Sequence, residues 1–223
     1  MKSSASKTPW VDSHFHVFSA GQGRLGARYI PAYDASLYDW LAAAGSAGVR
    51  RGVLVQTSFL GTDNTRLRLE LREHPEVLRG IAVIDPETPA QEMRRLHADG
   101  VRGIRLNLSG ISHDLAAWNR APQLWDEIGR LGWHVELHTD VGALPTVMGQ
   151  IPVGIHVVVD HMAKPDRPSA DDLTVACLRA RSRVSGVHVK LSGAYRLGGR
   201  DAKAIAQMLQ AELGNDRLLW GSD

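Results

Sequence analysis

Residues 11–18 read VDSHFHVF, a short apolar run that leads into two histidines separated by one aromatic residue. Side chains alternate between the two faces of a strand, so His14 and His16 point the same way with backbones about 6–7 Å apart, while Phe15 points to the other side and packs. A dinucleotide-binding strand would instead lead into a G-x-G-x-x-G turn. The stretch therefore argues against a dinucleotide site and predicts two imidazoles that reach one ion or one substrate.

Seven further short runs rich in Val, Ile and Leu follow, separated by longer helical patterns, as expected for strands buried on both faces. The predicted strands are Trp10–His14, Gly52–Gln56, Gly80–Ile84, Gly103–Leu108, His134–His138, His156–Asp160, His188–Leu191 and Leu218–Gly221. The predicted helices are Ser36–Ala47, Thr65–Glu73, Pro89–Ala98, Ala121–Leu131, Ala143–Gln150, Ala170–Val184 and Asp201–Leu213. This alternation indicates the α/β class and a (β/α)8 TIM barrel, with an open doubly wound sheet as the alternative.

Only Ser222 and Asp223 follow the last predicted strand. A typical β/α barrel has about 250 residues and a helix after each of its strands. We therefore expect a single domain over residues 1–223, a barrel truncated after strand 8 with helix 8 missing.

The composition is that of an ordinary globular protein, with 43% hydrophobic residues and a formal net charge of +2. No block of basic residues suggests a nucleic-acid groove, and no apolar stretch is long enough to span a membrane. The polar N-terminus lacks the apolar core of a signal peptide, and the single Cys177 cannot form an intramolecular disulfide. These features predict a soluble cytoplasmic protein that acts on a small anionic substrate, with a homo-oligomer left open.

Polar side chains gather at the carboxyl ends of the predicted strands, where β/α barrels place their chemistry. Four histidines and one aspartate end strands 1, 5, 6 and 8, namely His14, His16, His138, His161 and Asp223. Cations lie beside them, namely Arg105, Lys164 and Arg196. A lone strand histidine is usually structural, but five such groups at matching strand ends are hard to explain as packing. The sequence therefore predicts a functional site at one mouth of the barrel.

Three further polar residues at this end are predicted to contact the substrate, namely Asn107, Ser58 and Tyr33. Asn107 shares a strand face with an arginine, Ser58 follows strand 2, and Tyr33 lies in the long loop after strand 1. Structural alternatives exist for two of the cations. Lys164 could be a solvated loop cation, and Arg196 could pair on the surface with Asp201.

Strand alternation also places two charged residues inside the barrel. Glu136 lies two residues below His138, and Lys190 two residues below Ser192. Buried charges need partners, so we predict that Glu136 and Lys190 pair with each other or with Asp12.

The order of these motifs resembles the amidohydrolase superfamily, and most closely its amidohydrolase-2 type lactonases similar to 2-pyrone-4,6-dicarboxylate hydrolase. The stretches that carry the resemblance are VDSHFHVF, QTSFLGTDN, GVRGIRLN, VVDHMAKP, VKLSGAYR and LLWGSD. The resemblance implies a (β/α)8 hydrolase in which Asp223 is the general base that activates water. It further implies that His14, His16 and His161 are site histidines, and that Arg105, Lys164 and Arg196 hold substrate carboxylates.

The resemblance leaves the cofactor open between none and one divalent metal. The two-metal enzymes of the superfamily use a bridging Lys or Glu on strand 4, where this chain has Arg105-Leu106-Asn107, so a two-metal centre is not expected. The dicarboxylate lactonase type is understood to work without metal. However, His14, His16, His138 and Asp223 together resemble a mononuclear zinc site, and these donor types suit Zn²⁺.

The sequence thus predicts a hydrolase that opens a carboxylated lactone with water activated by Asp223. A sugar lactonase and a metal-dependent decarboxylase of the same superfamily are the enzymatic alternatives. A non-catalytic binding barrel, or an inactive fragment, is the alternative from another class.

Overall fold

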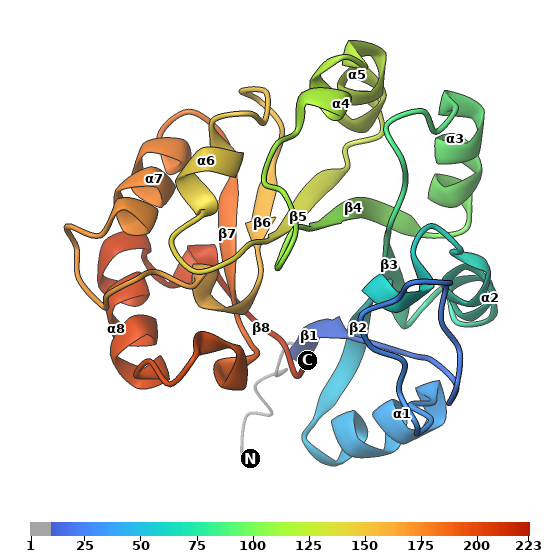
Figure 1. Ribbon diagram of the computed structural model, residues 1–223. Coiled ribbons are helices and arrows are strands. Elements are labelled where there is room, and N and C mark those ends of the chain that lie inside the picture. Colours follow the sequence, from blue (N-terminus) through green and yellow to red (C-terminus); the bar gives the residue numbers. More distant parts are fainter. Residues whose placement is uncertain (1–9) are drawn as a thin grey trace, which may run out of the picture.

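A computed structural model of the protein describes residues 10–223. Eight parallel strands follow one another in chain order, each hydrogen-bonded to the next. The strands are β1 Trp10–Phe15, β2 Val49–Val55, β3 Leu78–Ala82, β4 Val101–Asn107, β5 His134–His138, β6 Val157–Val159, β7 Val187–Leu191 and β8 Leu218–Trp220. Figure 1 shows them around a common axis with the helices outside, so the predicted (β/α)8 barrel is confirmed.

The helices cover the outside of the strands, and the apolar core fills the layer between them (Figure 1). They are α1 Leu37–Ser46, α2 Thr65–Glu73, α3 Ala90–Ala98, α4 Ala116–Asn119, α5 Pro122–Arg130, α6 Leu144–Met148, α7 Leu173–Ser182 and α8 Ala202–Leu213. Every predicted helix is present, and α4 is an addition too short to give a periodic pattern. Across residues 10–223, no helix combines the length and apolar character needed to cross a bilayer.

Glycine explains why the prediction placed strands β2 and β3 too late. Gly52 and Gly80 were expected to begin these strands, but both lie inside them. A Cβ on Gly80 would clash with Leu71 of α2, so the missing side chain lets the helix pack closely against the strand. Gly52 in the same way makes room for Phe15 and Trp40, whose rings stack with centroids 4.1 Å apart. This contact confirms that Phe15 points to the outer side of the barrel.

Hydrogen bonds around Asp12 join the first and last strands of the barrel. The Asp12 carboxylate accepts from the backbone N–H of Ser222 at 2.9 Å and from its hydroxyl at 2.6 Å. It also accepts from the indole N–H of Trp40 at 2.9 Å, which ties α1 to the same point. The backbone N–H of Asp223 then donates to the His14 carbonyl at 2.9 Å. The seam between β1 and β8 therefore fixes Asp223 beside His14.

Candidate functional site

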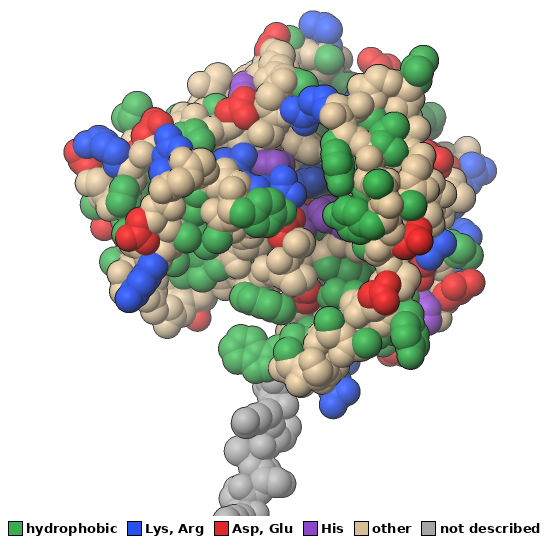
Figure 2. Space-filling model, turned by 60° about the horizontal axis from the view of Figure 1, so that its bottom comes forward, with side chains coloured by type: hydrophobic (Ala, Val, Ile, Leu, Met, Phe, Trp, Pro, Cys, Tyr) green, Lys and Arg blue, Asp and Glu red, His purple; other side chains and the backbone are tan. Residues whose placement is uncertain are grey.

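The four predicted histidines meet at the carboxyl end of the barrel. Figure 2 shows histidine and basic side chains gathered in a hollow on this face. The ring centroids lie 4.9 Å apart for His14 and His16, 5.1 Å for His14 and His161, and 4.6 Å for His138 and His161. Together with Asp223 we call these histidines the mouth cluster, and the prediction that these five residues converge is confirmed by the geometry.

The side chains of His14 and His16 project the same way, as predicted, and their rings are perpendicular to each other. Their Nε2 atoms are 3.3 Å apart, and His16 Nδ1 lies 2.7 Å from the carbonyl oxygen of Val55 in the neighbouring strand. Burial, reinforced by His14 and Arg105, holds the pKa of His16 well below its ordinary value. His16 is therefore a neutral imidazole at neutral pH.

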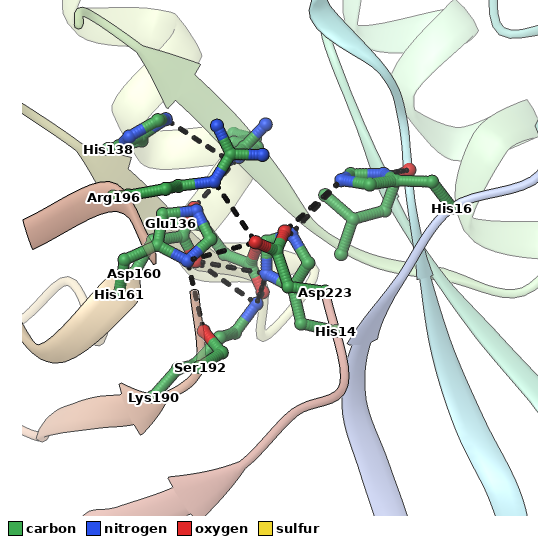
Figure 3. Close-up of polar contacts among 12 residues, drawn as sticks. His14, His16, Glu136, His138, Asp160, His161, Lys190, Ser192, Arg196 and Asp223 are labelled. Carbon is green, nitrogen blue, oxygen red and sulfur yellow. Dashed lines mark hydrogen bonds and ion pairs between the residues drawn. The ribbon is translucent and has the colours of Figure 1, made fainter. Parts of the chain in front are cut away.

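Asp223 presents its two carboxylate oxygens to different neighbours (Figure 3). Oδ1 lies 3.5 Å from Nε2 of His14 and 3.8 Å from Nε2 of His16, and it is buried without a hydrogen-bond partner. Oδ2 accepts from the Tyr195 hydroxyl at 2.7 Å and from Nε of Arg196 at 3.0 Å. One oxygen is thus held in place, while the other faces the imidazoles.

Electrostatics keep this carboxylate ionised. Burial alone would raise the pKa of Asp223, but His161, His14, Tyr195 and Arg196 outweigh it and hold the pKa far below its ordinary value. Conversely, burial and the bond to Asp223 raise the pKa of Tyr195 to about 12. Tyr195 is therefore a neutral donor to an ionised Asp223.

A left-handed turn after β6 aims His161 at the site. Four consecutive residues from His161 to Lys164 have positive φ angles of 50°, 58°, 58° and 43°, although none of them is a glycine. Such a backbone is costly for residues with a Cβ, and strain of this kind concentrates at functional sites. Gly193 completes the fit, because a Cβ there would lie 2.5 Å from Nδ1 of His161 and 2.9 Å from Oδ2 of Asp223.

His138 and His161 are also neutral. Burial lowers the pKa of His161 to about 3, although Asp160 and Asp223 oppose the shift. Burial, with Arg105 and then His161, lowers the pKa of His138 even further. Nδ1 of His161 contacts the Ser192 hydroxyl at 3.0 Å, whereas Nε2 of both rings is buried without a hydrogen-bond partner. Both rings therefore offer an unsatisfied nitrogen.

Four charged residues lie beneath the mouth cluster, and we call them the inner layer: Arg105, Glu136, Asp160 and Lys190. Lys190 Nζ is 2.5 Å from Oε1 of Glu136, and each of these residues is only 1% exposed. Lys190 Nζ also lies 3.3 Å from Oδ1 of Asp160, whose Oδ2 accepts from Nε of Arg105 at 2.8 Å. The predicted pairing of Glu136 with Lys190 is confirmed, whereas Asp12 serves the seam instead.

The inner layer is electrically balanced, with two cations and two carboxylates. Burial would raise the pKa of Asp160, but Lys190 and Arg105 outweigh it and hold the pKa well below its ordinary value. Lys190 likewise lowers the pKa of Glu136 against the effect of burial. Both carboxylates are thus ionised, and each lies against a basic side chain of the layer.

The three predicted cations already have hydrogen-bond partners within the protein. Arg105 is buried and already bonded, through Nε to Asp160 and through NH2 to Nδ1 of His138 at 3.3 Å. Lys164 is buried and donates to the Thr139 carbonyl at 2.9 Å, so the solvated-cation alternative is wrong. The alternative pairing of Arg196 with Asp201 is also wrong, because Arg196 donates to the mouth cluster.

The predicted polar contacts are less closely engaged. Oδ1 of Asn107 is buried without a hydrogen-bond partner, next to the β5 residue His138 in the strand register. Ser58 is exposed and begins a short 3-10 turn, and Tyr33 is 58% exposed with its ring edge against Phe18. Among residues 10–223, neither Ser58 nor Tyr33 has a side-chain hydrogen bond to the mouth cluster.

Sequence reasoning missed residues that contact the site, among them Ser192, Asp160 and Tyr195. Asp160 lies two residues after Val158 of β6, and strand alternation applied there would have placed it inside the barrel beside Lys190. Tyr195 offered no comparable signal, because it reaches Asp223 from the 3-10 turn η3, Ala194–Leu197, which has no strand alternation to read.

Three residues of the mouth cluster fit a single divalent cation. Donor atoms of His14, His16 and Asp223 lie within 4.8 Å of one another, and Oδ1 of Asp223 is unpartnered. Neutral imidazoles and a carboxylate are usual Zn²⁺ ligands. His138, which was predicted to complete this set, is not among those donor atoms. Its Nδ1 faces Arg105, and its Nε2 is unpartnered.

A β/α barrel with histidines and an aspartate at the carboxyl ends of strands 1, 5, 6 and 8 defines an amidohydrolase-type hydrolase. The family model described as amidohydrolase matches residues 11–223, and the chain belongs to this family.

Relatives with specific names cover nearly the whole chain. A 2-pyrone-4,6-dicarboxylate hydrolase of Comamonas testosteroni is 30% identical over 96% of this chain and 75% of its own length. A 4-sulfomuconolactone hydrolase of Rhizobium radiobacter is 29% identical over 97% of this chain and 75% of its own length. A crystal structure from Acinetobacter baumannii, described as a probable 2-pyrone-4,6-dicarboxylic acid hydrolase with citric acid bound, has a TM-score of 0.85 at 30% identity. It covers 96% of this chain and 84% of the other.

Proposed function

We propose that the protein hydrolyses a lactone that carries carboxylates, similar to 2-pyrone-4,6-dicarboxylate, with Asp223 as the base that activates water. One observation carries the proposal. Oδ1 of Asp223 is buried, ionised and unpartnered among imidazoles, while Oδ2 is held by Tyr195 and Arg196. A general base needs this combination of a free oxygen and a fixed orientation.

The neutral imidazoles would supply donors for the lactone carbonyl. Arg105 can only donate, so Nδ1 of His138 accepts its hydrogen bond and Nε2 of this neutral ring carries the proton. That N–H is buried without a partner, as expected for a group that donates to a carbonyl oxygen of the bound substrate. Donors placed where negative charge develops lower the barrier to attack on a carbonyl.

In this proposal, Arg196 and Lys164 are the cations that hold the substrate carboxylates. The side chain of Arg196 is 36% exposed. To bind a substrate carboxylate, it would exchange its contact with the Asp223 carboxylate for one with the substrate. Lys164 is buried beside β5, where burial lowers its pKa and a carboxylate would compensate its charge. Arginine suits bidentate binding of a carboxylate, and lysine acts as a point charge.

The relatives support this substrate class. Two of them are named as hydrolases of 2-pyrone-4,6-dicarboxylate and of 4-sulfomuconolactone, and the third was crystallised with citric acid, a carboxylate-rich molecule. A divalent cation held by His14, His16 and Asp223 would, when bound, polarise the lactone carbonyl and lower the pKa of water.

The test compares substrates and metal content in one assay. Ring opening of 2-pyrone-4,6-dicarboxylate is measured beside that of an uncharged sugar lactone, with chelator and with added Zn²⁺. We expect kcat/KM for the dicarboxylate to exceed that for the sugar lactone by about 10³-fold or more, because unpaired cations penalise the neutral ring. Equal turnover of both substrates would favour a sugar lactonase, and CO₂ release without ring opening a decarboxylase.

A matched pair of variants tests the carboxylate contact. Arg196→Met should raise KM for the dicarboxylated lactone by about tenfold or more, because it removes a charge-assisted hydrogen bond. Arg200→Met is the control, since Arg200 lies on the same segment but donates to the backbone carbonyls of Asp166 and Leu197. Equal KM values for the two variants would contradict a substrate role for Arg196.

A further inference from the structure

Lys190 lies directly beneath His14 and has three possible acceptors around it. Its Nζ is 3.0 Å from Nδ1 of His14, 2.5 Å from Oε1 of Glu136 and 3.3 Å from Oδ1 of Asp160 (Figure 3). A lysine ammonium has three N–H donors and no acceptor. Lys190 can therefore only donate across its 3.0 Å contact with Nδ1 of His14, and this nitrogen must accept. An imidazole that accepts at Nδ1 carries its proton on Nε2.

The opposite end of the histidine pair leads to the same assignment independently. A carbonyl oxygen can only accept, so Nδ1 of His16 donates to Val55 at 2.7 Å. The neutral His16 ring therefore has a lone pair on Nε2, which faces Nε2 of His14 at 3.3 Å. A hydrogen bond between the two Nε2 atoms then takes its proton from His14, in agreement with the contact of Lys190 at Nδ1. Lys190, His14, His16 and the Val55 carbonyl thus form one chain of hydrogen bonds, in which each group donates to the next.

We propose that Lys190 is a positioning residue that fixes His14 in the tautomer with the proton on Nε2, and so aligns the donor that faces His16 and Asp223. The Nε2 atom of His14 that carries this proton lies 3.5 Å from Oδ1 of Asp223. The assignment of the His14 tautomer does not depend on the proposed function. The expected effect of Lys190 on turnover does rest on the proposed function.

The alternative tautomer has a partner ready in the structure. Oδ1 of Asp160 lies 3.3 Å from Nδ1 of His14 and would accept a proton from it. In that arrangement Nε2 of His14 would carry a lone pair and could bind a metal, as in the carboxylate–histidine–zinc arrangement. Lys190 therefore decides whether His14 offers a donor to an anion or a lone pair to a cation.

The first measurement uses the unmodified protein labelled with ¹⁵N-histidine. Long-range ¹H–¹⁵N correlations distinguish the two neutral tautomers, and a His14→Gln variant assigns the resonances. We expect the pattern of a proton on Nε2 for His14 and on Nδ1 for His16. A proton on Nδ1 of His14 in the unmodified protein would overturn the proposal, whether or not the protein hydrolyses a lactone.

The second measurement removes the donor without unbalancing the inner layer. The double variant Lys190→Met, Glu136→Gln deletes one cation and one carboxylate and leaves Asp160 paired with Arg105. The control is Glu136→Gln, which keeps the ammonium next to His14. We expect the double variant alone to move the His14 proton to Nδ1, with both variants checked by circular dichroism. An unchanged tautomer in a folded double variant would refute the role of Lys190.

Zinc affinity and kcat distinguish a positioning role from a structural one. If Lys190 only stabilised the fold, its loss would not raise zinc affinity while lowering kcat. Relative to the control, the double variant should bind Zn²⁺ at least about tenfold more tightly by calorimetry, because Nε2 of His14 gains a lone pair. Its kcat for the lactone should fall by about 10–100-fold with little change in KM. Unchanged zinc affinity, or a loss confined to KM, would count against the proposal.

Discussion

The inner layer lies directly beneath the mouth cluster in the same barrel, yet the polar groups of the two sets are organised differently. Every side chain of the inner layer has a partner of opposite charge, as in the contacts of Lys190 with Glu136 and of Arg105 with Asp160. Buried atoms without a hydrogen-bond partner occur in both sets, on Glu136 and Asp160 of the inner layer and on His138, His161 and Asp223 of the mouth cluster. Those of the inner layer belong to ion-paired carboxylates, whereas in the mouth cluster they include Nε2 of two neutral imidazoles. Strand alternation positions most of these residues, and the left-handed turn after β6 adds His161. The difference teaches that full ion pairing marks the part that supports the fold, whereas neutral imidazoles around a carboxylate with one unpartnered oxygen mark the part proposed to react.

The largest expected effect is on turnover and comes from the mouth cluster. Asp223→Asn keeps the side-chain shape but removes the proton acceptor, so kcat should fall by about 10³–10⁴-fold while the protein stays folded. Steady-state kinetics and a thermal melt measure the two effects. The control is Asp216→Asn, an exposed carboxylate in the turn before β8 that should leave kcat unchanged. Turnover by Asp223→Asn near that of the unmodified protein would show that another group is the base.

The inner layer should respond in stability. Asp160→Asn removes one of two carboxylates that compensate Arg105 and Lys190, and leaving a buried charge uncompensated costs about 3–5 kcal/mol. Chemical denaturation measures the change in the free energy of unfolding. A loss below about 1 kcal/mol would mean that the layer does not depend on charge balance, and the contrast with the mouth cluster would fail.

Gly193 tests whether the mouth cluster needs its close spacing. Gly193→Ala would place a methyl group against His161 and Asp223, and kcat should fall by about 10–100-fold because the reacting groups are displaced. Gly199→Ala is the matched control. Gly199 also has a positive φ, of 81°, but no atom lies within 4 Å of the point where a Cβ would stand, so it shares the backbone strain without the contact. Equal kcat values would attribute the effect to strain alone.

The smallest effect is a pH dependence of stability. The pKa of His161 is about 3 in the folded protein, below its ordinary value of 6.5, so unfolding binds a proton between these limits. The stability contributed by the neutral ring is fully present above about pH 6.5 and is lost as the pH falls toward 3. Within that window, His161→Asn should reduce the slope of unfolding free energy against pH by up to about 1.4 kcal/mol per pH unit. Identical slopes for both proteins would contradict a buried neutral His161.

Strand alternation and strand-end positions predicted the barrel, the convergence of five site residues and the pairing of Glu136 with Lys190. These features depend on repeating geometry, which a sequence displays directly. The turn after β6 could not be predicted, because four left-handed residues without glycine run against local preference and persist only through tertiary contacts. The bonding of Arg105 within the barrel was equally hidden, since a cation at a strand end can face a ligand or a neighbouring carboxylate.

The seam at Asp12 has a consequence for how the molecule folds. Its hydrogen bonds to Ser222 join positions 210 residues apart, and contacts of such high sequence separation form slowly because a long loop must close first. We therefore expect recovery of enzymatic activity during refolding to lag behind the recovery of helical circular dichroism. Recovered turnover would then report on the final folding step, the closure of the seam, and not on the formation of most of the secondary structure.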